Sequence, residues 1–341
     1  MEKLFKNKSV LITGGAGSVG QELAREILKH RPKVLRIFDI DETRQFELQR
    51  ELGKLKNIRF LLGDVRDRGR LRYAIEDIDI IFHVAALKHV EACEYNPFEA
   101  IKTNVLGTQN VIDVAIEEEV SKVIFTSSDK AVNPTNVMGT TKLMCERLMT
   151  AANYYKGLRD IVFSSVRFGN VVGSSGSVTP LFKTQIQAGG PLTVTNPNMT
   201  RYIMPMSQAL RLLFKVTEMT QGGEVFIFKM SAVKVSDLAK AIIGSLASKH
   251  GFAPEDIKVR VTGSKPGEKM HEELMTEDEA KRALETKDMF IVLPEMKELS
   301  TRFRYPGAKP ARARSYKSSD AKLLNKEEIK KMLREGRLLE A

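Results

Sequence analysis

The chain has 341 residues, of which 42% are hydrophobic and 28% are charged. These proportions exclude a disordered protein, and the length suffices for one large α/β domain with a smaller lobe attached. The formal net charge of +11 suits an anionic partner, but its sign alone does not choose between a nucleic acid, a membrane surface and a phosphorylated substrate.

The sequence also bounds the compartment. No uninterrupted apolar segment approaches the roughly 20 residues that span a bilayer, and the start MEKLFKNKSV lacks the apolar core of a signal peptide. We therefore expect a cytoplasmic protein without a membrane span. Cys93 and Cys145 are too few for a disulfide framework and lack metal-ligand spacing, so we expect small packing residues and no metal site.

The first predicted strand leads directly into a glycine-rich turn. Ser9–Thr13 is a short apolar run, typical of a buried parallel strand, and residues 14–20 follow with the spacing G-x-x-G-x-x-G. Glycines at such a turn let backbone N–H groups approach a pyrophosphate. Because a helical apolar pattern comes next, we interpret the turn as a dinucleotide site rather than a simple glycine turn. The expected cofactor contacts are Gly14, Gly17, Ser18, Val19 and Gly20.

A second predicted strand, Val34–Phe38, ends at Asp39, about 20 residues beyond the glycine turn. A carboxylate at this position can accept both hydroxyls of the adenosine ribose and would repel a 2′-phosphate. This favours NAD over NADP. Arg44 can still reach a phosphate, so NADP stays the alternative.

Two more apolar runs, at residues 58–62 and 78–82, predict the third and fourth strands. The fourth is followed by the small residues Ala85 and Ala86. Small side chains there would let the backbone lie against the cofactor, so we include both among the expected cofactor contacts.

Four polar residues in this part of the chain need an interpretation. Lys88 and His89 follow the fourth strand and can contact a substrate, with a loop or interface role as the alternative for His89. We interpret His83 as a packed, hydrogen-bonded core histidine. Asn104 falls inside a helix predicted from Asn96 to about Glu118, where Asn has poor propensity and needs a structural reason.

The stretch TSSDKAVNPTNVMGTTK, residues 126–142, carries the strongest concentration of candidate catalytic groups. An apolar run ends where Ser128, Asp129 and Lys130 emerge together. Open α/β sheets keep their chemistry at the carboxyl ends of their strands. We therefore expect the active site here.

A helix is predicted to follow this strand end. Asn133–Asn136 is typical of a turn, with Thr135 or Asn136 as the helix N-cap. On the helix, Met138 and Lys142 lie four residues apart on one face. That face can look back at the end of the strand.

This layout resembles the extended short-chain dehydrogenase/reductase superfamily, in which a Ser or Thr and a Tyr-x-x-x-Lys pair oxidise a substrate with a nicotinamide cofactor. Within it, DKAVNPTNVMGTTK is similar to the nucleotide-sugar 4,6-dehydratases that act on UDP-N-acetylglucosamine. Met138 occupies the Tyr position, as it does in some branches of that family. The resemblance covers approximately residues 8–335 and includes the later block GSKPGEKMHEEL, residues 263–274.

The resemblance implies an α/β fold, namely a Rossmann-type doubly wound parallel sheet with a smaller C-terminal substrate-binding lobe. Residues 1–168 would form the NAD(P)-binding domain. Residues 169–341 would form mainly the nucleotide-sugar lobe, with some segments returning to the first domain. Because RFRYPGAKPARARSYK interrupts the ordered pattern, we expect a basic, solvated C-terminal tail.

The resemblance also assigns roles outside the central stretch. Asp64, beside Val65, would meet the adenine amine, and Asn104 would support the active site. Lys142 would hold the hydroxyls of the nicotinamide ribose. The implied contacts with the nucleotide sugar are Asn170, Ser177, Arg201, Lys265 and Glu268, with Arg201 and Lys265 on the phosphates and Glu268 on the ribose.

The implied reaction oxidises C4 of the sugar, eliminates water across C5 and C6, and returns the hydride to C6. Asp129 would protonate the leaving C6 hydroxyl, Lys130 would take the C5 proton, and Ser128 would hydrogen-bond the C4 oxygen. Lys130 needs a lowered pKa for this role, which we expect from its burial and from Lys142 or the positively charged cofactor. Met138 would be an apolar wall, which makes Asp129 the candidate acceptor of the C4 hydroxyl proton.

Three alternatives remain at this level. A UDP-sugar 4-epimerase on the same fold needs only the reversible oxidation and would lack the Asp129–Lys130 pair. A non-catalytic NAD-binding regulator is suggested by Met138. A nucleic-acid-binding protein is suggested by the charge, but no recognised module supports it. We expect a tightly bound cofactor, a UDP-sugar substrate, a homo-oligomer and no nucleic-acid partner.

Overall fold

The structure is a computed structural model that describes residues 2–174, 176–296, 303–312, 314–336 and 338–339. Ten of the described strands form one large sheet in the order β16-β14-β15-β10-β6-β5-β4-β1-β2-β3. The strands from β10 to β3 are parallel to their neighbours, whereas β14, β15 and β16 pair antiparallel. The parallel strands are β1 (Ser9–Thr13), β2 (Val34–Asp39), β3 (Ile58–Leu62), β4 (Ile80–His83), β5 (Lys122–Ser128), β6 (Val162–Phe168) and β10 (Val225–Phe228).

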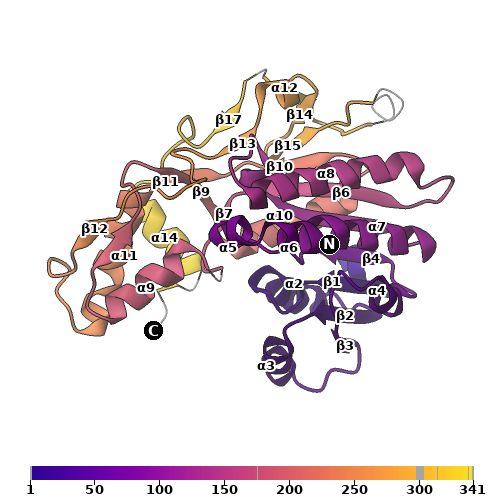
Figure 1. The fold of residues 1–341 in the computed structure, drawn as a ribbon, viewed down its shortest axis with the longest axis horizontal. Coiled ribbons are helices and arrows are strands. Elements are labelled where there is room, and N and C mark those ends of the chain that lie inside the picture. The colour runs from indigo at the N-terminus through magenta and orange to yellow at the C-terminus, as the bar shows by residue number, and fades with distance from the viewer. Residues whose placement is uncertain (1, 175, 297–302, 313, 337, 340–341) are drawn as a thin grey trace.

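Helices cover both faces of this sheet (Figure 1). On one face, apolar side chains of α2, α3 and α10 pack on the strands, and on the other face those of α4, α7 and α8 do so. Coverage on both sides explains why every residue of β1 is buried. The helices are α1 (Glu2–Phe5), α2 (Ser18–Leu28), α3 (Glu42–Leu52), α4 (Arg68–Ile75), α7 (Gly107–Glu117), α8 (Val137–Tyr155) and α10 (Met206–Met219).

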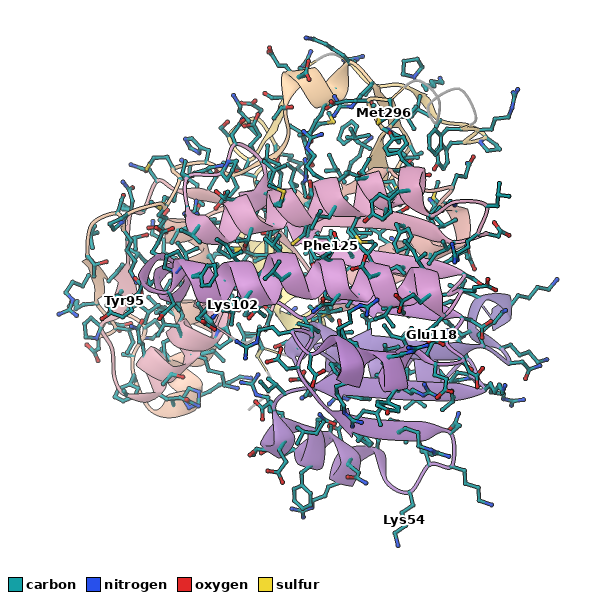
Figure 2. The ribbon with its side chains drawn as sticks, turned by 45° about the vertical axis from the view of Figure 1, so that its right-hand side comes forward. Lys54, Tyr95, Lys102, Glu118, Phe125 and Met296 are labelled. Atoms are coloured by element: carbon teal, nitrogen blue, oxygen red, sulfur yellow. The ribbon has the colours of Figure 1, made fainter. Side chains whose placement is uncertain are left out.

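The predicted doubly wound sheet is therefore confirmed, and each predicted strand appears with its ends shifted by no more than two residues. The helix expected from Asn96 to about Glu118 differs from the prediction. It is divided into α6 (Pro97–Ala100), a π-helical stretch η1 (Ile101–Leu106) and α7, and it is preceded by α5 (Val90–Tyr95). Helices α7 and α8 lie side by side across the sheet (Figure 2).

A smaller lobe with its own apolar core lies beside the carboxyl end of the sheet (Figure 1). A three-stranded sheet in the order β11-β9-β7 joins it to the main body, and β8 pairs with β12 inside it. The elements are β7 (Asn170–Val171), α9 (Val178–Gln187), β8 (Leu192–Val194), β9 (Thr200–Met204), β11 (Ser231–Lys234), α11 (Val235–Leu246), η3 (Ser248–His250), β12 (Val259–Val261) and α14 (Lys326–Glu335).

Most described residues of the basic C-terminal segment, which was expected to be a solvated tail, are exposed, but the segment is also attached to the fold. Strand β16 extends the large sheet, and Tyr305 is buried, with its hydroxyl on the carboxylate of Glu224. Aromatic residues between the basic ones supply buried anchors while the charged heads stay outside. The part of the chain between β12 and α14 contains β13 (Glu273–Met275), α12 (Glu277–Ala280), β14 (Ala283–Glu285), β15 (Met289–Val292), β16 (Lys309–Pro310) and β17 (Tyr316–Lys317).

None of the described helices combines the length and the hydrophobicity that crossing a bilayer would require.

Candidate active site

The candidate site lies where β5 gives way to the short turn η2 (Asp129–Ala131). Ser128 Oγ donates to Asp129 Oδ1 at 2.8 Å, and Lys130 Nζ donates to the same oxygen at 2.9 Å. Asp129 is fully buried, and its Oδ2 has no hydrogen-bond partner among the described residues. Ser128, Asp129 and Lys130 therefore form one network that contains an unpaired carboxylate oxygen.

Two glycines let neighbouring elements close around the network. A Cβ on Gly139, in the first turn of α8, would lie 2.2 Å from the carbonyl oxygen of Lys130. A Cβ on Gly169, which follows β6, would lie 2.6 Å from Tyr202 Cβ and 3.2 Å from Asp129 Oδ2. A larger residue at either position would force the helix or the strand away from the site.

Glu272 is a member of the site that the sequence interpretation missed. It is 3% exposed, and its Oε1 lies 3.6 Å from Lys130 Nζ and 3.8 Å from Arg201 Nε. Its second oxygen, Oε2, is buried and unpaired within the described part of the chain. The two adjacent acids in HEEL were the available signal, but only the fold brings one of them to Lys130.

The expected lowering of the Lys130 pKa is wrong for this structure. Burial lowers the pKa, but the carboxylates of Asp129 and Glu272 raise it further, so that the net shift is above the ordinary lysine value. Lys142 does not act as the expected cationic neighbour, because its Nζ is directed to the carbonyl oxygen of Thr126 at 3.0 Å.

The first turns of α8 place Met138 and Lys142. Asn136 is the N-cap, since its Oδ1 accepts the N–H of Gly139 at 2.8 Å. Met138 is buried and packs in a small apolar cluster with Cys93 and Ala100. Lys142 is also buried, which lowers its pKa.

Both cysteines are buried and free, as the packing interpretation expected. His83 is a core histidine, also as expected. Its Nδ1 lies 2.6 Å from Thr13 Oγ1 and its Nε2 lies 3.0 Å from Thr108 Oγ1. Burial lowers its pKa to about 3, so the ring is neutral at physiological pH.

Asn104 has a structural reason for its position in a helix. Its Oδ1 accepts the N–H of Leu87 at 2.7 Å, and its Nδ2 donates to the carbonyl oxygen of Leu87 and to Thr141 Oγ1. The side chain thus ties the loop after β4 to α8. It lies in the π-helical stretch η1, a distortion that is frequent at functional sites.

The glycine turn has the shape that a dinucleotide needs. A Cβ on Gly14 would lie 2.6 Å from the backbone nitrogen of Ala85, and one on Gly20 would lie 2.3 Å from the carbonyl oxygen of Gly14. Helix α2 begins at Ser18 with no side-chain cap from Gly17. Backbone N–H groups at such a helix start favour a phosphate.

Asp39, at the end of β2, lies against the glycine turn. Its Oδ2 accepts the N–H of Ala16 at 2.9 Å and its Oδ1 accepts the N–H of Asp41 at 3.0 Å, which fixes the carboxylate and leaves lone pairs for two hydroxyls. Arg44 already has a carboxylate nearby, with its Nε 3.4 Å from Asp41 Oδ2. The residues present therefore fit a dinucleotide with unmodified ribose hydroxyls.

The remaining expected cofactor residues lie around the same site, formed by the glycine turn and Asp39. Val65 is buried, and a Cβ on Gly107 would lie 2.7 Å from its methyl group. Both oxygens of Asp64 accept from Arg66, one from its backbone and one from its guanidinium. Ala86 is half-buried in the loop after β4.

The structure brings two expected substrate residues together near the network. Arg201 Nη2 lies 3.1 Å from Glu268 Oε1, which also accepts from Thr195 Oγ1 at 3.0 Å. The Lys265 side chain is directed elsewhere, since its Nζ pairs with Glu91 of α5 at 2.6 Å. Arg201 and Glu268 are therefore linked to Lys130 through Glu272, whereas the Lys265 ammonium is not.

The other expected substrate residues line the loops between sheet and lobe. His89 is exposed, and its ring contacts the loop of Gly176, where an added Cβ would lie 2.4 Å from Cε1. Lys88 is exposed beside it. Ser177 precedes α9, with its Oγ 3.2 Å from Thr179 Oγ1, and Asn170 is half-buried in β7.

The turn at residues 133–136 and the later block at residues 263–274 contact each other directly. Thr135 Oγ1 and Asn136 Nδ2 donate to the carbonyl oxygen of Gly267 at 3.0 and 3.1 Å. Asn133 Nδ2 donates to Glu273 Oε2 at 2.7 Å. The turn before α8 and the KPGEK loop therefore form one side of the site.

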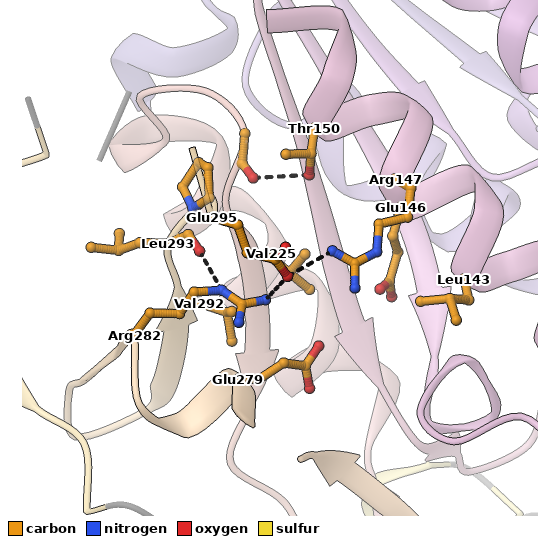
Figure 3. A pocket seen from close by; sticks show the side chains of 12 residues that line it. Leu143, Glu146, Arg147, Thr150, Val225, Glu279, Arg282, Val292, Leu293 and Glu295 are labelled. Atoms are coloured by element: carbon orange, nitrogen blue, oxygen red, sulfur yellow. Dashed lines mark hydrogen bonds and ion pairs between the residues drawn. The ribbon is translucent and has the colours of Figure 1, made fainter. Parts of the chain in front are cut away.

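A small cavity of about 30 Å³ lies elsewhere, between α8 and the segment of β14 and β15 (Figure 3). Arg282 and Arg147 approach Glu295 across it at 3.0 and 3.1 Å. It contains none of the expected catalytic or binding residues.

Residues 10–294 match the family model described as polysaccharide biosynthesis protein. The chain is 52% identical over 335 residues, 98% of each protein, to an uncharacterized membrane protein of Methanocaldococcus jannaschii. A solved structure, that of Pen from Bacillus thuringiensis, is 46% identical with a TM-score of 0.92 and covers 98% of this chain and 99% of its own.

Two similar relatives carry names that describe an activity. The UDP-N-acetylglucosamine 4,6-dehydratase (inverting) of Campylobacter jejuni is 39% identical over 296 residues, 86% of this chain and 85% of the relative. The UDP-glucose 4-epimerase of Rickettsia canadensis is 36% identical over 336 residues, 97% of this chain and 96% of the relative.

Proposed function

The chain belongs to the polysaccharide biosynthesis protein family of extended short-chain dehydrogenases/reductases, and from that premise we propose that it is a UDP-N-acetylglucosamine 4,6-dehydratase. At the coarser level it is a nucleotide-sugar modifying enzyme. The proposed product is a UDP-4-keto-6-deoxy-hexosamine with inversion at C5. The name of the Campylobacter relative supports both the substrate and the inversion.

The observation that carries this proposal is the hydrogen bond between Lys130 Nζ and Asp129 Oδ1 at the end of β5. Elimination of water across C5 and C6 needs a base at C5 and an acid at C6. One proton moving along this 2.9 Å contact converts the ammonium and carboxylate into an amine and a carboxylic acid. The pair can thus reach the required protonation states without a proton from outside.

The groups around the pair take the remaining roles. Ser128 Oγ, whose single proton is donated to Asp129 Oδ1, would hydrogen-bond the C4 oxygen by accepting from its hydroxyl. Met138 cannot take the C4 hydroxyl proton, because a thioether is only a weak acceptor. That proton is therefore accepted by Asp129, directly or through Ser128, and passes on to solvent before Asp129 receives the proton of Lys130. Buried Met138 forms an apolar wall beside these steps.

We propose NAD as the tightly bound cofactor. Gly14, Gly17 and Gly20 would receive the pyrophosphate, Asp39 the adenosine ribose and Lys142 the nicotinamide ribose. When bound, the cofactor accepts the two electrons of the C4 oxidation and returns them at C6. The paired carboxylate oxygens of Asp39 and the partnered Arg44 support NAD over NADP.

A UDP-sugar 4-epimerase is the second candidate, because a relative of similar identity has an epimerase name. That reaction needs only oxidation and reduction at C4. It needs no acid at C6 and no base at C5, so the Asp129–Lys130 pair would have no role in it.

We further propose that the protein works as a homo-oligomer in the cytoplasm. Large exposed apolar side chains on α5, α6, η1 and α8 support association through this helical face; they are Tyr95, Phe98, Leu106 and Met144. Light scattering of the purified protein tests it, and a monomer at micromolar concentration would contradict it.

The function is tested by incubating the purified protein with UDP-N-acetylglucosamine. The dehydratase forms a product lighter by one water, and NMR assigns the C4 ketone, the C6 methyl group and the C5 configuration. A product of unchanged mass with inverted C4 would identify an epimerase. Bound NAD without any product would identify a regulator.

A further inference from the structure

Glu272 is held rigidly although it is not part of a regular element. Its backbone N–H donates to Ser318 Oγ at 2.9 Å, and its carbonyl oxygen accepts the N–H of Ser318 at 2.8 Å. The adjacent residue His271 bonds through Nδ1 to Thr200 Oγ1 at 2.8 Å. The carboxylate therefore projects into the site from a fixed backbone.

This buried carboxylate is poorly paired for its location. Its contacts with Lys130 and Arg201, at 3.6 and 3.8 Å, are longer than the 2.7–2.9 Å of a charge-assisted hydrogen bond. Its Oε2 is buried and has no partner in the described residues. Burying a charge with such weak compensation is unfavourable, so stability alone does not account for a glutamate here.

Glu272 also links two functional groups. Through one oxygen it faces Lys130, the proposed base, and Arg201, which pairs with Glu268 in the proposed diphosphate site. The neighbouring Glu273 has no such position, because its carboxylate accepts from Asn133 instead.

We propose that Glu272 is a positioning residue for the elimination: it holds Lys130 Nζ beside Asp129 and stabilises the ammonium form until the proton moves to Asp129. This inference rests on the proposed function, since it takes Lys130 as the base at C5. Glu272 itself forms and breaks no covalent bond. Its effect is electrostatic and geometric.

The charged groups facing Lys130 determine in which direction its pKa should change when Glu272 is replaced. Asp129 on the same turn and Glu272 before β13 are anions that favour the ammonium. Arg201 of β9 is a cation that disfavours it, and Lys269, whose Nζ donates to the carbonyl oxygen of Val132, also interacts with Lys130. Removing the Glu272 charge therefore makes Lys130 lose its proton at lower pH.

The test compares Glu272→Gln with its matched neighbour Glu273→Gln in the full-length, cofactor-loaded protein. Dehydration of UDP-N-acetylglucosamine is measured against pH. In Glu272→Gln the rising limb of log kcat should move to lower pH by about one unit, as expected for loss of an opposite charge at this distance. In Glu273→Gln the limb should stay at the parent position.

A second variant separates position from charge. Glu272→Ala removes the anchor as well, so kcat should fall on the order of 10–100-fold while KM stays within about twofold. Glu272→Asp keeps the charge and should keep the parent limb, and it also serves if Glu272→Gln does not fold. Circular dichroism and cofactor content verify each variant.

The outcomes distinguish a failure of the proposed function from a failure of the proposed role of Glu272. A parent protein that does not dehydrate the sugar overturns the proposed function. An active parent whose Glu272→Gln limb coincides with that of Glu273→Gln overturns the role of Glu272 alone, as does a Glu272→Ala variant that changes only KM.

Discussion

Two clusters of buried charged side chains differ in how completely their hydrogen bonds are satisfied. In the first, Arg167 of β6 lies between Glu146 of α8 and Glu279 of α12, and all four carboxylate oxygens receive direct N–H bonds at 2.6–3.0 Å. In the second, Lys130 lies between Asp129 and Glu272, and one oxygen of each carboxylate has no partner among the described residues.

The comparison separates a structural use of buried charge from a functional one. In the Arg167 cluster every carboxylate oxygen accepts a hydrogen bond from Arg167, and these bonds join the C-terminal segment to the sheet. Arg167 also donates to the carbonyl oxygen of Leu274. The Lys130 cluster retains acceptors at the carboxyl end of the parallel strands, where ligands of this fold bind. Incomplete pairing at that edge supports the proposal that these groups act on a substrate.

The largest expected effect is the loss of turnover from the Lys130 cluster. Asp129→Asn and Lys130→Ala should each lower kcat roughly 10²–10⁴-fold, as expected for a positioned acid or base. Product formation is measured by NMR, with circular dichroism and bound cofactor as controls. Near-parental activity of Asp129→Asn would contradict the functional role of the Lys130 cluster.

The Arg167 cluster should show the opposite response. Arg167→Met leaves two carboxylates buried without their cation, and the free energy of unfolding should fall by about 3–5 kcal/mol. Denaturant unfolding measures this, with Asp129→Asn as the matched control. We expect that control to unfold close to the parent, because asparagine keeps an acceptor oxygen for Ser128 and Lys130, and Lys130 still faces Glu272. Equal destabilisation of the two variants would contradict the distinction.

A smaller effect is expected where the Lys130 cluster meets the lobe. Arg201→Ala and Glu268→Ala should each weaken UDP binding by on the order of 1–3 kcal/mol, the range for lost charge-assisted bonds. Lys265→Ala should weaken it less, because its ammonium is exposed and paired with Glu91. Calorimetry with UDP decides this, and an unchanged affinity in all three variants would show that the nucleotide lies elsewhere.

The smallest effect on chemistry is expected for Met138. Because it packs on Cys93 and Ala100 and contributes no proton transfer, Met138→Ala should retain measurable turnover. The same assay measures it beside Asp129→Asn. If Met138→Ala were the more damaged of the two, the assignment of the proton transfers to Asp129 and Lys130 would have to be abandoned.

The sequence was sufficient where the determining contacts are local. Apolar runs bounded by turn residues predicted the parallel strands, and the turn before α8 placed the N-cap at Thr135 or Asn136, of which the structure has Asn136. These features depend on residues within a few positions of each other.

Features that depend on distant residues were missed. Glu272 reaches Lys130 only because β13 folds back beside η2. Burial lowers the Lys130 pKa, but Asp129 and then Glu272 raise it further, so the expected lowering was wrong. The π-helical η1 contains Asn104, which is anchored to Leu87 and Thr141, and no helical periodicity encodes these contacts. The attachment of the C-terminal segment to the fold was also missed, because the aromatic residues that pack on the core, Phe303, Tyr305 and Tyr316, are spaced irregularly.

The most direct test of the account is to run the reaction in D₂O and locate deuterium in the product. If Lys130 removes the C5 proton within the Asp129–Lys130 pair, the 4-keto-6-deoxy product should have lost one water and should carry deuterium at C5. Protium retained at C5, or a sugar of unchanged mass epimerised at C4, would contradict the assignment of the poorly paired cluster to elimination.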